Sequence, residues 1–183
     1  METINWARDL AEQLLSGPLP RRWHHSEGVG RKAEAIAETL SADGELLACA
    51  AWLHDIGYAP DVIVTGFHPL DGARFLRDVA GVDLRLCSLV AHHSCADIEA
   101  RHRGLVAELC AEFKPVSGLL TDALTFCDIT TTPDGTPTDV ETRLADIYGR
   151  YGAGHMVTQS VSEAEPYLIG AVDRISRLVA AQR

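Results

Sequence analysis

Apolar residues recur at intervals of three and four along almost the whole chain. In residues 22–40, for example, Val29, Ala33 and Leu40 fall on one helical face. This spacing is typical of amphipathic helices. Strand-like alternation is confined to residues 61–65, which are too few to build a sheet. The sequence therefore predicts an all-α fold.

Turns rich in glycine, proline, serine and aspartate separate the expected helices. Residues 17–20 break the chain after the first helix, and residues 41–44 form a turn that offers an N-cap to the third. Ser162 and Glu165 have capping-box spacing, so we expect an interruption of the last helix near 160–166. The expected helices cover residues 3–15, 22–40, 45–55, 67–79, 82–93, 96–103, 105–113, 117–129, 139–151 and 155–182.

The length and composition indicate one domain. With 183 residues and 46% hydrophobic content, the chain is long enough to bury a core without disulfides. No repeat, low-complexity tract or linker divides it, so we expect a single domain over residues 1–183. The five cysteines form no C-x-x-C pair and fall mostly in helical patterns. They predict buried free thiols and a reducing, cytoplasmic location.

The chain is acidic, with a net charge of −10 when histidine is neutral. Broad electrostatic attraction to nucleic acid or to an anionic membrane is therefore not expected. A small anionic substrate is compatible with this charge, because a bound metal ion outweighs the overall field locally. The acidic and polar first residues predict no signal peptide, and no apolar run reaches the ~18 residues of a membrane span.

Histidine and aspartate side chains gather at or near the ends of helices that are otherwise apolar. If these helix ends meet around one cleft, they supply three to six imidazole and carboxylate ligands. Mn, Fe, Co, Ni and Zn favour that mixture. The alternative is that each residue merely caps a solvated helix end. The candidate ligands are His25, His54, Asp55, His68, His92, His93 and Asp128.

The order of these residues resembles the H…HD…D signature of the HD superfamily, whose members are helical metal-dependent phosphohydrolases. Residues 22–29 (RWHHSEGV) resemble the family's R-x-x-H-[ST]-x-x-V, and residues 51–57 (AWLHDIG) resemble A-x-L-H-D-I-[GA]. Residues 123–128 (ALTFCD) resemble the closing L-x-x-A-D, with Cys127 where alanine is common. The combination is specific although each piece alone is weak.

Two further histidine motifs resemble those of the dinuclear HD subgroup. They lie at residues 67–73 (FHPLDGA) and 90–94 (VAHHS). The whole resemblance covers about residues 20–132 and implies a compact helical HD core. The remaining helices, in residues 139–182, are expected to pack on that core.

The resemblance implies that His25, His54, Asp55 and Asp128 bind a first divalent ion. Of these, His54 and Asp55 are expected to be essential for catalysis. A bound divalent ion lowers the pKa of water to near neutrality and clamps phosphoryl oxygens. The resulting hydroxide would attack phosphorus in line. Arg22, one helical turn before His25, is a candidate phosphate clamp and catalytic residue.

A second ion is also implied, with Asp55 bridging to His68 and to one of His92 and His93. The sequence does not separate the two adjacent histidines, and the paired histidines of related dinuclear proteins slightly favour His92. The interval from His54 to His68 is short for an HD-type hydrolase. A site with one ion is therefore the alternative.

The leading hypothesis is hydrolysis of a phosphoester or phosphoanhydride in a small phosphorylated metabolite or nucleotide. A second hypothesis is a di-iron oxygenase that resembles myo-inositol oxygenase and cleaves a C–C or C–P bond. A third is a non-catalytic metal- or ligand-binding module. The His68 and His92/His93 motifs are the feature that favours the oxygenase.

Residues beside the motifs have plainer roles in this interpretation. Lys32, about two turns beyond His25, is a weaker phosphate-binding candidate. His24 neighbours a proposed ligand but should point about 100° away from it. The last helix is apolar at positions such as Leu168. It covers either the core or a second copy of the chain, so a homo-oligomer stays open.

Overall fold

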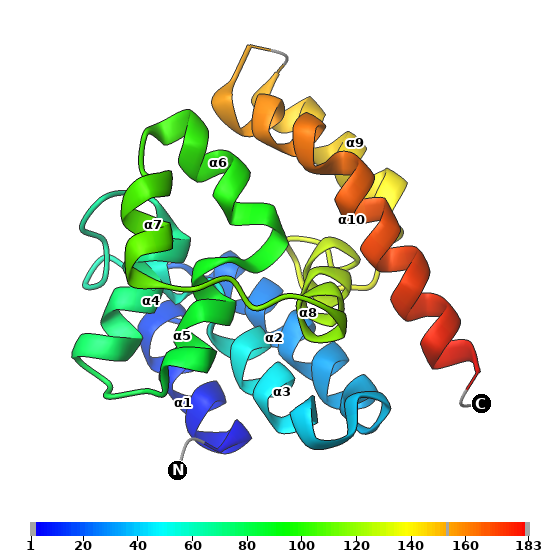
Figure 1. Cartoon of the computed structure of the whole chain (residues 1–183), viewed down its shortest axis with the longest axis horizontal. Helices are drawn as coiled ribbons and strands as arrows, with labels where there is room; N and C mark the ends of the chain where they lie inside the picture. The colour runs from blue at the N-terminus through cyan, green and yellow to red at the C-terminus, as the bar shows by residue number, and fades with distance from the viewer. Residues whose placement is uncertain (1–2, 153, 182–183) are drawn as a thin grey trace.

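The structure is a computed structural model that describes residues 3–152 and 154–181, and in these ranges it contains helices and no strands (Figure 1). Thr131 and Pro137 form an isolated β-bridge. The all-α prediction is confirmed. The helices are α1 (Ile4–Leu15), α2 (Pro20–Ile36), α3 (Gly44–Leu53), α4 (His68–Asp78), α5 (Leu84–Ala91), α6 (Ala96–Arg103), α7 (Val106–Glu112), α8 (Leu119–Ile129), α9 (Val140–Tyr151) and α10 (Met156–Ala180), with short 3-10 helices η1 (Ala37–Asp43), η2 (Ile56–Tyr58) and η3 (His93–Cys95).

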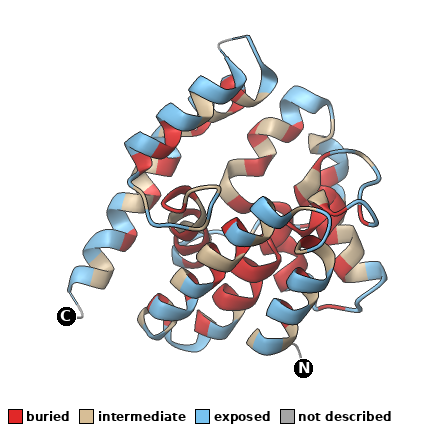
Figure 2. Cartoon of the chain, turned by 180° about the vertical axis from the view of Figure 1, so that it is seen from behind, coloured by how far each residue is buried: buried red, intermediate tan, exposed pale blue. Residues whose placement is uncertain are grey.

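Helix α3 is the centre of the packing because it is apolar on nearly every side. Helices α1, α2, α5 and α8 all pack against it. Its residues from Leu47 to Leu53 are all buried, and a helix that is apolar all round is stable only in such an interior. Figure 2 shows the buried residues gathered in the central helices and the exposed residues on the outer faces. The C-terminus of α3 therefore delivers His54 and Asp55 into the interior.

The chain turns closely after α3 because Gly57 has no side chain. A Cβ atom at Gly57 would lie 1.9 Å from the carbonyl oxygen of His68 and 2.7 Å from the backbone nitrogen of Gly72. The 3-10 helix η2 therefore packs directly on the first turns of α4. This close approach accommodates the short interval between His54 and His68 and brings His68 beside Asp55.

The loop before α4 is ordered by one carboxylate. Asp71 is buried and accepts hydrogen bonds from the backbone N–H groups of Val64, Thr65 and Gly66. Residues 61–65, the candidate strand, instead form part of this turn. In a β-strand, these backbone N–H groups would need a neighbouring strand to accept their hydrogen bonds. Here the Asp71 carboxylate accepts them instead.

Helices α9 and α10 lie along one side of the central helices (Figure 1). Helix α10 packs on α6, α8 and α9. A smaller apolar cluster fills these contacts and is distinct from the main core. Its buried members are Ile98, Ile129, Val140, Leu144, Ala164 and Leu168.

The predicted interruption of the last helix near 160–166 is wrong. Pro166 lies inside a continuous α10, where it removes one backbone donor without ending the helix. Glu165, expected in a capping box, accepts a hydrogen bond from the Tyr148 hydroxyl of α9 instead. Tertiary packing has overridden the local signal. The predicted end of this helix at residue 182 lies outside the described residues.

The second helix ends earlier than the expected 22–40. Helix α2 stops at Ile36 and passes into η1, where Ser41 has a φ of 51°. Asp43 makes no side-chain capping bond to α3. Its carboxylate pairs with Arg85 at 2.8 Å, so a long-range ion pair replaces the expected N-cap.

The five cysteines form no disulfide in the described residues, and Cys49, Cys87 and Cys127 are buried. Burial raises the pKa of Cys127 to about 12, so this thiol stays protonated at neutral pH. In residues 3–152 and 154–181, no helix combines the length and the apolar character needed to cross a bilayer.

We expect Gly57→Ala to lower the free energy of unfolding by about 1–3 kcal/mol, because the new methyl group must displace backbone atoms. Thermal unfolding of the purified protein measures the effect. Gly149→Ala is the matched control, since Gly149 lies in α9 with no atom within 4 Å of its Cβ position. Alanine there should stabilise the helix by about 0.5–1 kcal/mol. Equal stability of Gly57→Ala and wild type would contradict the close approach.

Candidate metal centre

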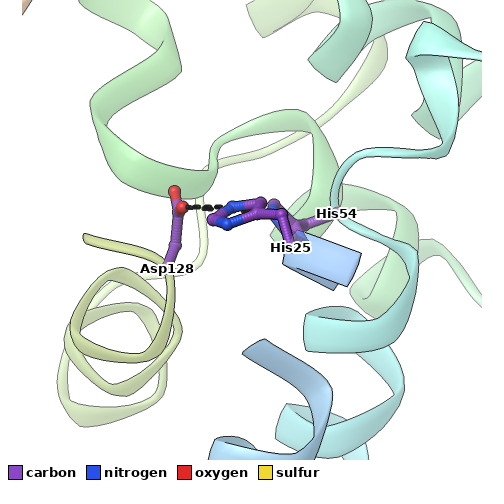
Figure 3. A group of neighbouring side chains, drawn as sticks. All are labelled: His25, His54 and Asp128. Atoms are coloured by element: carbon purple, nitrogen blue, oxygen red, sulfur yellow. Dashed lines mark hydrogen bonds and ion pairs between the residues drawn. The ribbon is translucent and has the colours of Figure 1, made fainter. Parts of the chain in front are cut away.

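Three side chains from different helices meet in one group (Figure 3). His25 comes from the second turn of α2, His54 ends α3, and Asp128 lies in the last turn of α8. Their ligand atoms all lie within 4.8 Å of one another. His25 Nε2 is 3.0 Å from Asp128 Oδ1, and His54 Nε2 is 4.0 Å from the same oxygen. We call these three residues the first group.

Asp55, His68 and His93 form a second group beside the first. Asp55 Oδ1 lies 3.3 Å from His68 Nε2, and the Nε2 atoms of His68 and His93 are 3.2 Å apart. The other Asp55 oxygen, Oδ2, lies 3.4 Å from His54 Nε2 and 3.9 Å from His25 Nε2. Asp55 therefore presents one carboxylate oxygen to each group.

Backbone carbonyl oxygens set the orientation of three of the imidazole rings. A carbonyl only accepts, so each Nδ1 carries a hydrogen, and in the neutral ring Nε2 is then the atom that a metal ion would bind. Metal-binding histidines are commonly oriented in this way. The Nδ1-to-oxygen pairs are His25 with Thr132 at 3.0 Å, His54 with Ala51 at 2.7 Å and His93 with Val90 at 2.7 Å.

The donor set fits divalent metal ions. His54 Nε2 is buried and has no hydrogen-bond partner in the described part of the chain, an arrangement that costs free energy unless a partner is supplied. The Nε2 atoms of His68 and His93 face each other with Asp55 alongside. Imidazole nitrogen with carboxylate oxygen suits Mn, Fe, Co, Ni and Zn, and a cation would satisfy these acceptors together.

Residues 22–147 match the family described as HD domain, and the match covers more than half of the chain. The protein belongs to this family. The matched residues include every member of both groups, so the predicted family membership is confirmed. The match also runs beyond residue 132, where the sequence motifs end, into α9.

Part of this chain is similar to proteins named ribonuclease Y. That of Rubrobacter xylanophilus is 32% identical over 83 residues, which are 45% of this chain and 16% of that protein. That of Rhodopirellula baltica is 34% identical over 93 residues, which are 50% of this chain and 18% of that protein. The chain thus spans less than a fifth of these relatives, and no solved structure matches it significantly.

His93, and not His92, lies in the second group of the HD domain. His92 Nε2 donates to the backbone carbonyl oxygen of Phe113 at 2.9 Å. Helix α5 ends at Ala91, directly before the two histidines. Ser94 and Cys95, directly after them, have φ values of 48° and 62° and form a left-handed turn. The slight preference for His92 is therefore revised, because its ring is engaged by the backbone.

Arg22 and Tyr58 lie against the two groups. Arg22 Nη1 donates to Asp55 Oδ2 at 2.7 Å, and its guanidinium lies 4.1 Å from the centroid of the Tyr58 ring. Tyr58 stacks on His68 with ring centroids 4.0 Å apart. The sequence motifs do not include Tyr58, and its position directly after Gly57 is the signal that could have identified it.

Lys32 and His24 take no part in the site. Lys32 Nζ donates to Thr130 Oγ1 at 2.7 Å and also to the Thr130 carbonyl oxygen. It thereby fixes the end of α8, and burial lowers its pKa. The structure therefore does not support the weaker hypothesis that Lys32 binds phosphate. His24 is exposed, as expected.

The buried charges of the HD domain site balance one another in the absence of a metal ion. Burial favours a high pKa for Asp55, but positive Arg22 and His54 hold this pKa well below its usual value. Burial likewise favours a low pKa for His54, but the adjacent Asp55 raises it to about 9. Burial lowers the pKa values of His68 and His93, which stay neutral. His54 therefore carries a proton that a metal ion would replace.

Metal binding should release a proton from His54 at neutral pH. With a pKa of about 9, His54 is protonated below that pH, and only the neutral imidazole binds a metal ion. Calorimetric titration with Zn²⁺ at about pH 7, in two buffers of different ionisation enthalpy, counts the protons released. The release should vanish above about pH 9. Zn²⁺ binding at neutral pH without proton release would contradict a protonated His54.

His93→Ala should reduce the bound ions from two per chain to one, because it removes a donor of the second group only. Elemental analysis of the purified protein gives the count. His92→Gln is the matched control, since glutamine keeps a donor for the Phe113 carbonyl and leaves both groups complete. Equal metal loss in the two variants would overturn the choice of His93.

Proposed function

We propose that this protein is a metal-dependent phosphohydrolase that acts on a small phosphorylated metabolite or nucleotide. The observation that supports this most directly is the position of Asp55 between the two groups of candidate ligands. In this proposal, His25, His54 and Asp128 would hold one divalent ion, and His68 and His93 would hold a second. Asp55 would contribute an oxygen to each site.

The cavity at the centre suits a small substrate. It has a volume of about 150 Å³, and residues of both groups line it together with residues of α9 and α10. Sites for drug-sized ligands measure about 300–1,000 Å³. The size of the cavity therefore favours a phosphoryl group with a compact remainder. The apolar side chains of Ile147, Val161 and Leu168 form the wall contributed by α9 and α10.

In this proposal, different residues of the chain have different roles in hydrolysis. Bound divalent ions supply the activation of water and the neutralisation of phosphoryl charge. The orientation of His25, His54 and His93 by backbone carbonyls holds the donors in place before substrate arrives. Arg22 lines the cavity, and its guanidinium has the geometry to bind two phosphoryl oxygens.

A di-iron oxygenase is the second candidate function. The completeness of the second group, with Asp55, His68 and His93 in reach of one ion, favours it over a one-ion hydrolase. Two iron ions per chain and oxygen uptake with a C–C or C–P substrate would support the oxygenase. Bound metal without turnover of either kind would support a non-catalytic module instead.

We further propose a small-molecule substrate and a cytoplasmic location. The net charge of −10 opposes broad binding of nucleic acid, although the similar relatives are named ribonuclease Y. Free cysteines favour a reducing compartment. A homo-oligomer, in which the apolar last helix covers a second copy of the chain, stays a prediction.

Asp55→Ala and His54→Ala should each lower the rate of hydrolysis by about 100-fold or more. Each substitution removes a candidate metal ligand, and the bound ion would stabilise the charge of the reacting phosphoryl group. The assay follows release of nitrophenol from p-nitrophenyl phosphate and bis(p-nitrophenyl) phosphate, and of phosphate from a nucleotide panel, with added Mn²⁺. His24→Ala is the control, since His24 is an exposed neighbour of His25. Activity that survives in Asp55→Ala would exclude the proposed centre.

A further inference from the structure

A second cavity, of about 380 Å³, lies beside the metal centre and is lined by arginines. Arg22, His25, Arg143 and Arg150 line both this cavity and the smaller one. Arg21 adds a further guanidinium to the second cavity. No acidic residue in the described part of the chain lines it. The two cavities therefore share a basic wall.

Arg143 is the unusual member of this wall because it is buried. It is only 8% exposed, and its Nε has no hydrogen-bond partner in the described ranges. Its Nη1 pairs with Asp146 at 3.0 Å. A buried guanidinium donor without an acceptor is costly. Because Arg143 lines both cavities, a bound anion there would meet a buried guanidinium.

The charges that line the second cavity do not balance. Its four arginines pair with three carboxylates, because Arg143 and Arg150 share the single carboxylate of Asp146. One positive charge is therefore in excess, in a chain whose net charge is −10. The partner of Arg22 is Asp55, which is also the proposed bridging ligand. Bound cations would make the wall more positive still.

The start of α2 adds to this positive field. Leu19, the N-cap residue of α2, makes no side-chain capping bond, and Pro20 follows it as the first helical residue. Both residues line the second cavity. The N-terminus of a helix carries a partial positive charge and favours anions. The N-terminus of α2 and the buried guanidinium of Arg143 therefore both contribute positive charge to the second cavity.

We propose that the second cavity binds a second phosphate group of the substrate and that Arg143 is the residue that selects it. This inference rests on the proposed phosphohydrolase function and narrows the substrate to compounds with two phosphate groups, such as a nucleoside diphosphate or a bisphosphate metabolite. The phosphoryl group to be hydrolysed lies beside Asp55. The second phosphate lies across the wall formed by Arg22 and Arg143, where guanidinium geometry matches its oxygens.

Direct binding tests the cavity independently of turnover. Methylenediphosphonate and inorganic phosphate are titrated by calorimetry into the full-length protein, both as purified and after treatment with a chelator. Arg143→Gln should weaken binding to the chelator-treated protein by about 10–100-fold, because it removes a charge-assisted pair. Arg143→Lys, which keeps the charge, should retain part of the affinity. Arg174→Gln is the control, since Arg174 pairs with Asp122 on the surface of α10 and α8.

Kinetics with AMP and ADP distinguish a substrate phosphate from a free anion. Arg143→Gln should raise KM for ADP by a much larger factor than it raises KM for AMP, because only ADP carries the second phosphate. Equal effects on AMP and ADP, or binding of both probes as tight as in wild type, would overturn the inference. If neither nucleotide nor any phosphoester is hydrolysed, the proposed function fails. The calorimetric comparison of Arg143→Gln with Arg143→Lys then decides the anion site alone.

Discussion

The buried charge of Asp55 is the constraint on which the rest of the site depends. A carboxylate that is 3% exposed is stable only with positive or donating partners around it. Arg22 provides one from α2, and His54 and His68 approach from α3 and α4. Because each partner comes from a different element, the ends of these elements must converge on one point. The candidate metal centre is the result of that convergence.

Apolar packing creates the interior in which this happens. Helices α1, α2, α5 and α8 pack around the apolar surface of α3, so the polar residues at its C-terminus, His54 and Asp55, are buried. The missing side chain of Gly57 then lets α4 approach closely enough for His68 to reach Asp55. His54 Nε2 is buried and has no hydrogen-bond partner in the described part of the chain. A buried polar atom of this kind is costly unless a ligand such as a metal ion supplies the partner.

Helices α9 and α10 extend the site beyond the part that the sequence motifs cover. Their own apolar cluster holds them against α6 and α8, and this contact positions Arg143 and Arg150 next to the metal centre. The sequence motifs do not include these two arginines, because neither lies at a position that a motif specifies. Their role depends on a contact between segments more than a hundred residues apart, with Arg22 on one side of the wall.

The sequence by itself determined the helical class and the resemblance to the HD family. It predicted four ligands for a first ion, namely His25, His54, Asp55 and Asp128. The structure brings His25, His54 and Asp128 together in the first group and places Asp55 in the second. Helical periodicity is a local property, so the sequence predicts it directly. The order of His25, His54 and Asp128 is recognisable because each residue lies at or near the end of a predicted helix. Only the tertiary structure distinguished His93 from His92, since the left-handed turn and the Phe113 carbonyl decide which ring enters the site. The continuity of α10 was also a tertiary outcome, because packing outweighed the local capping signal.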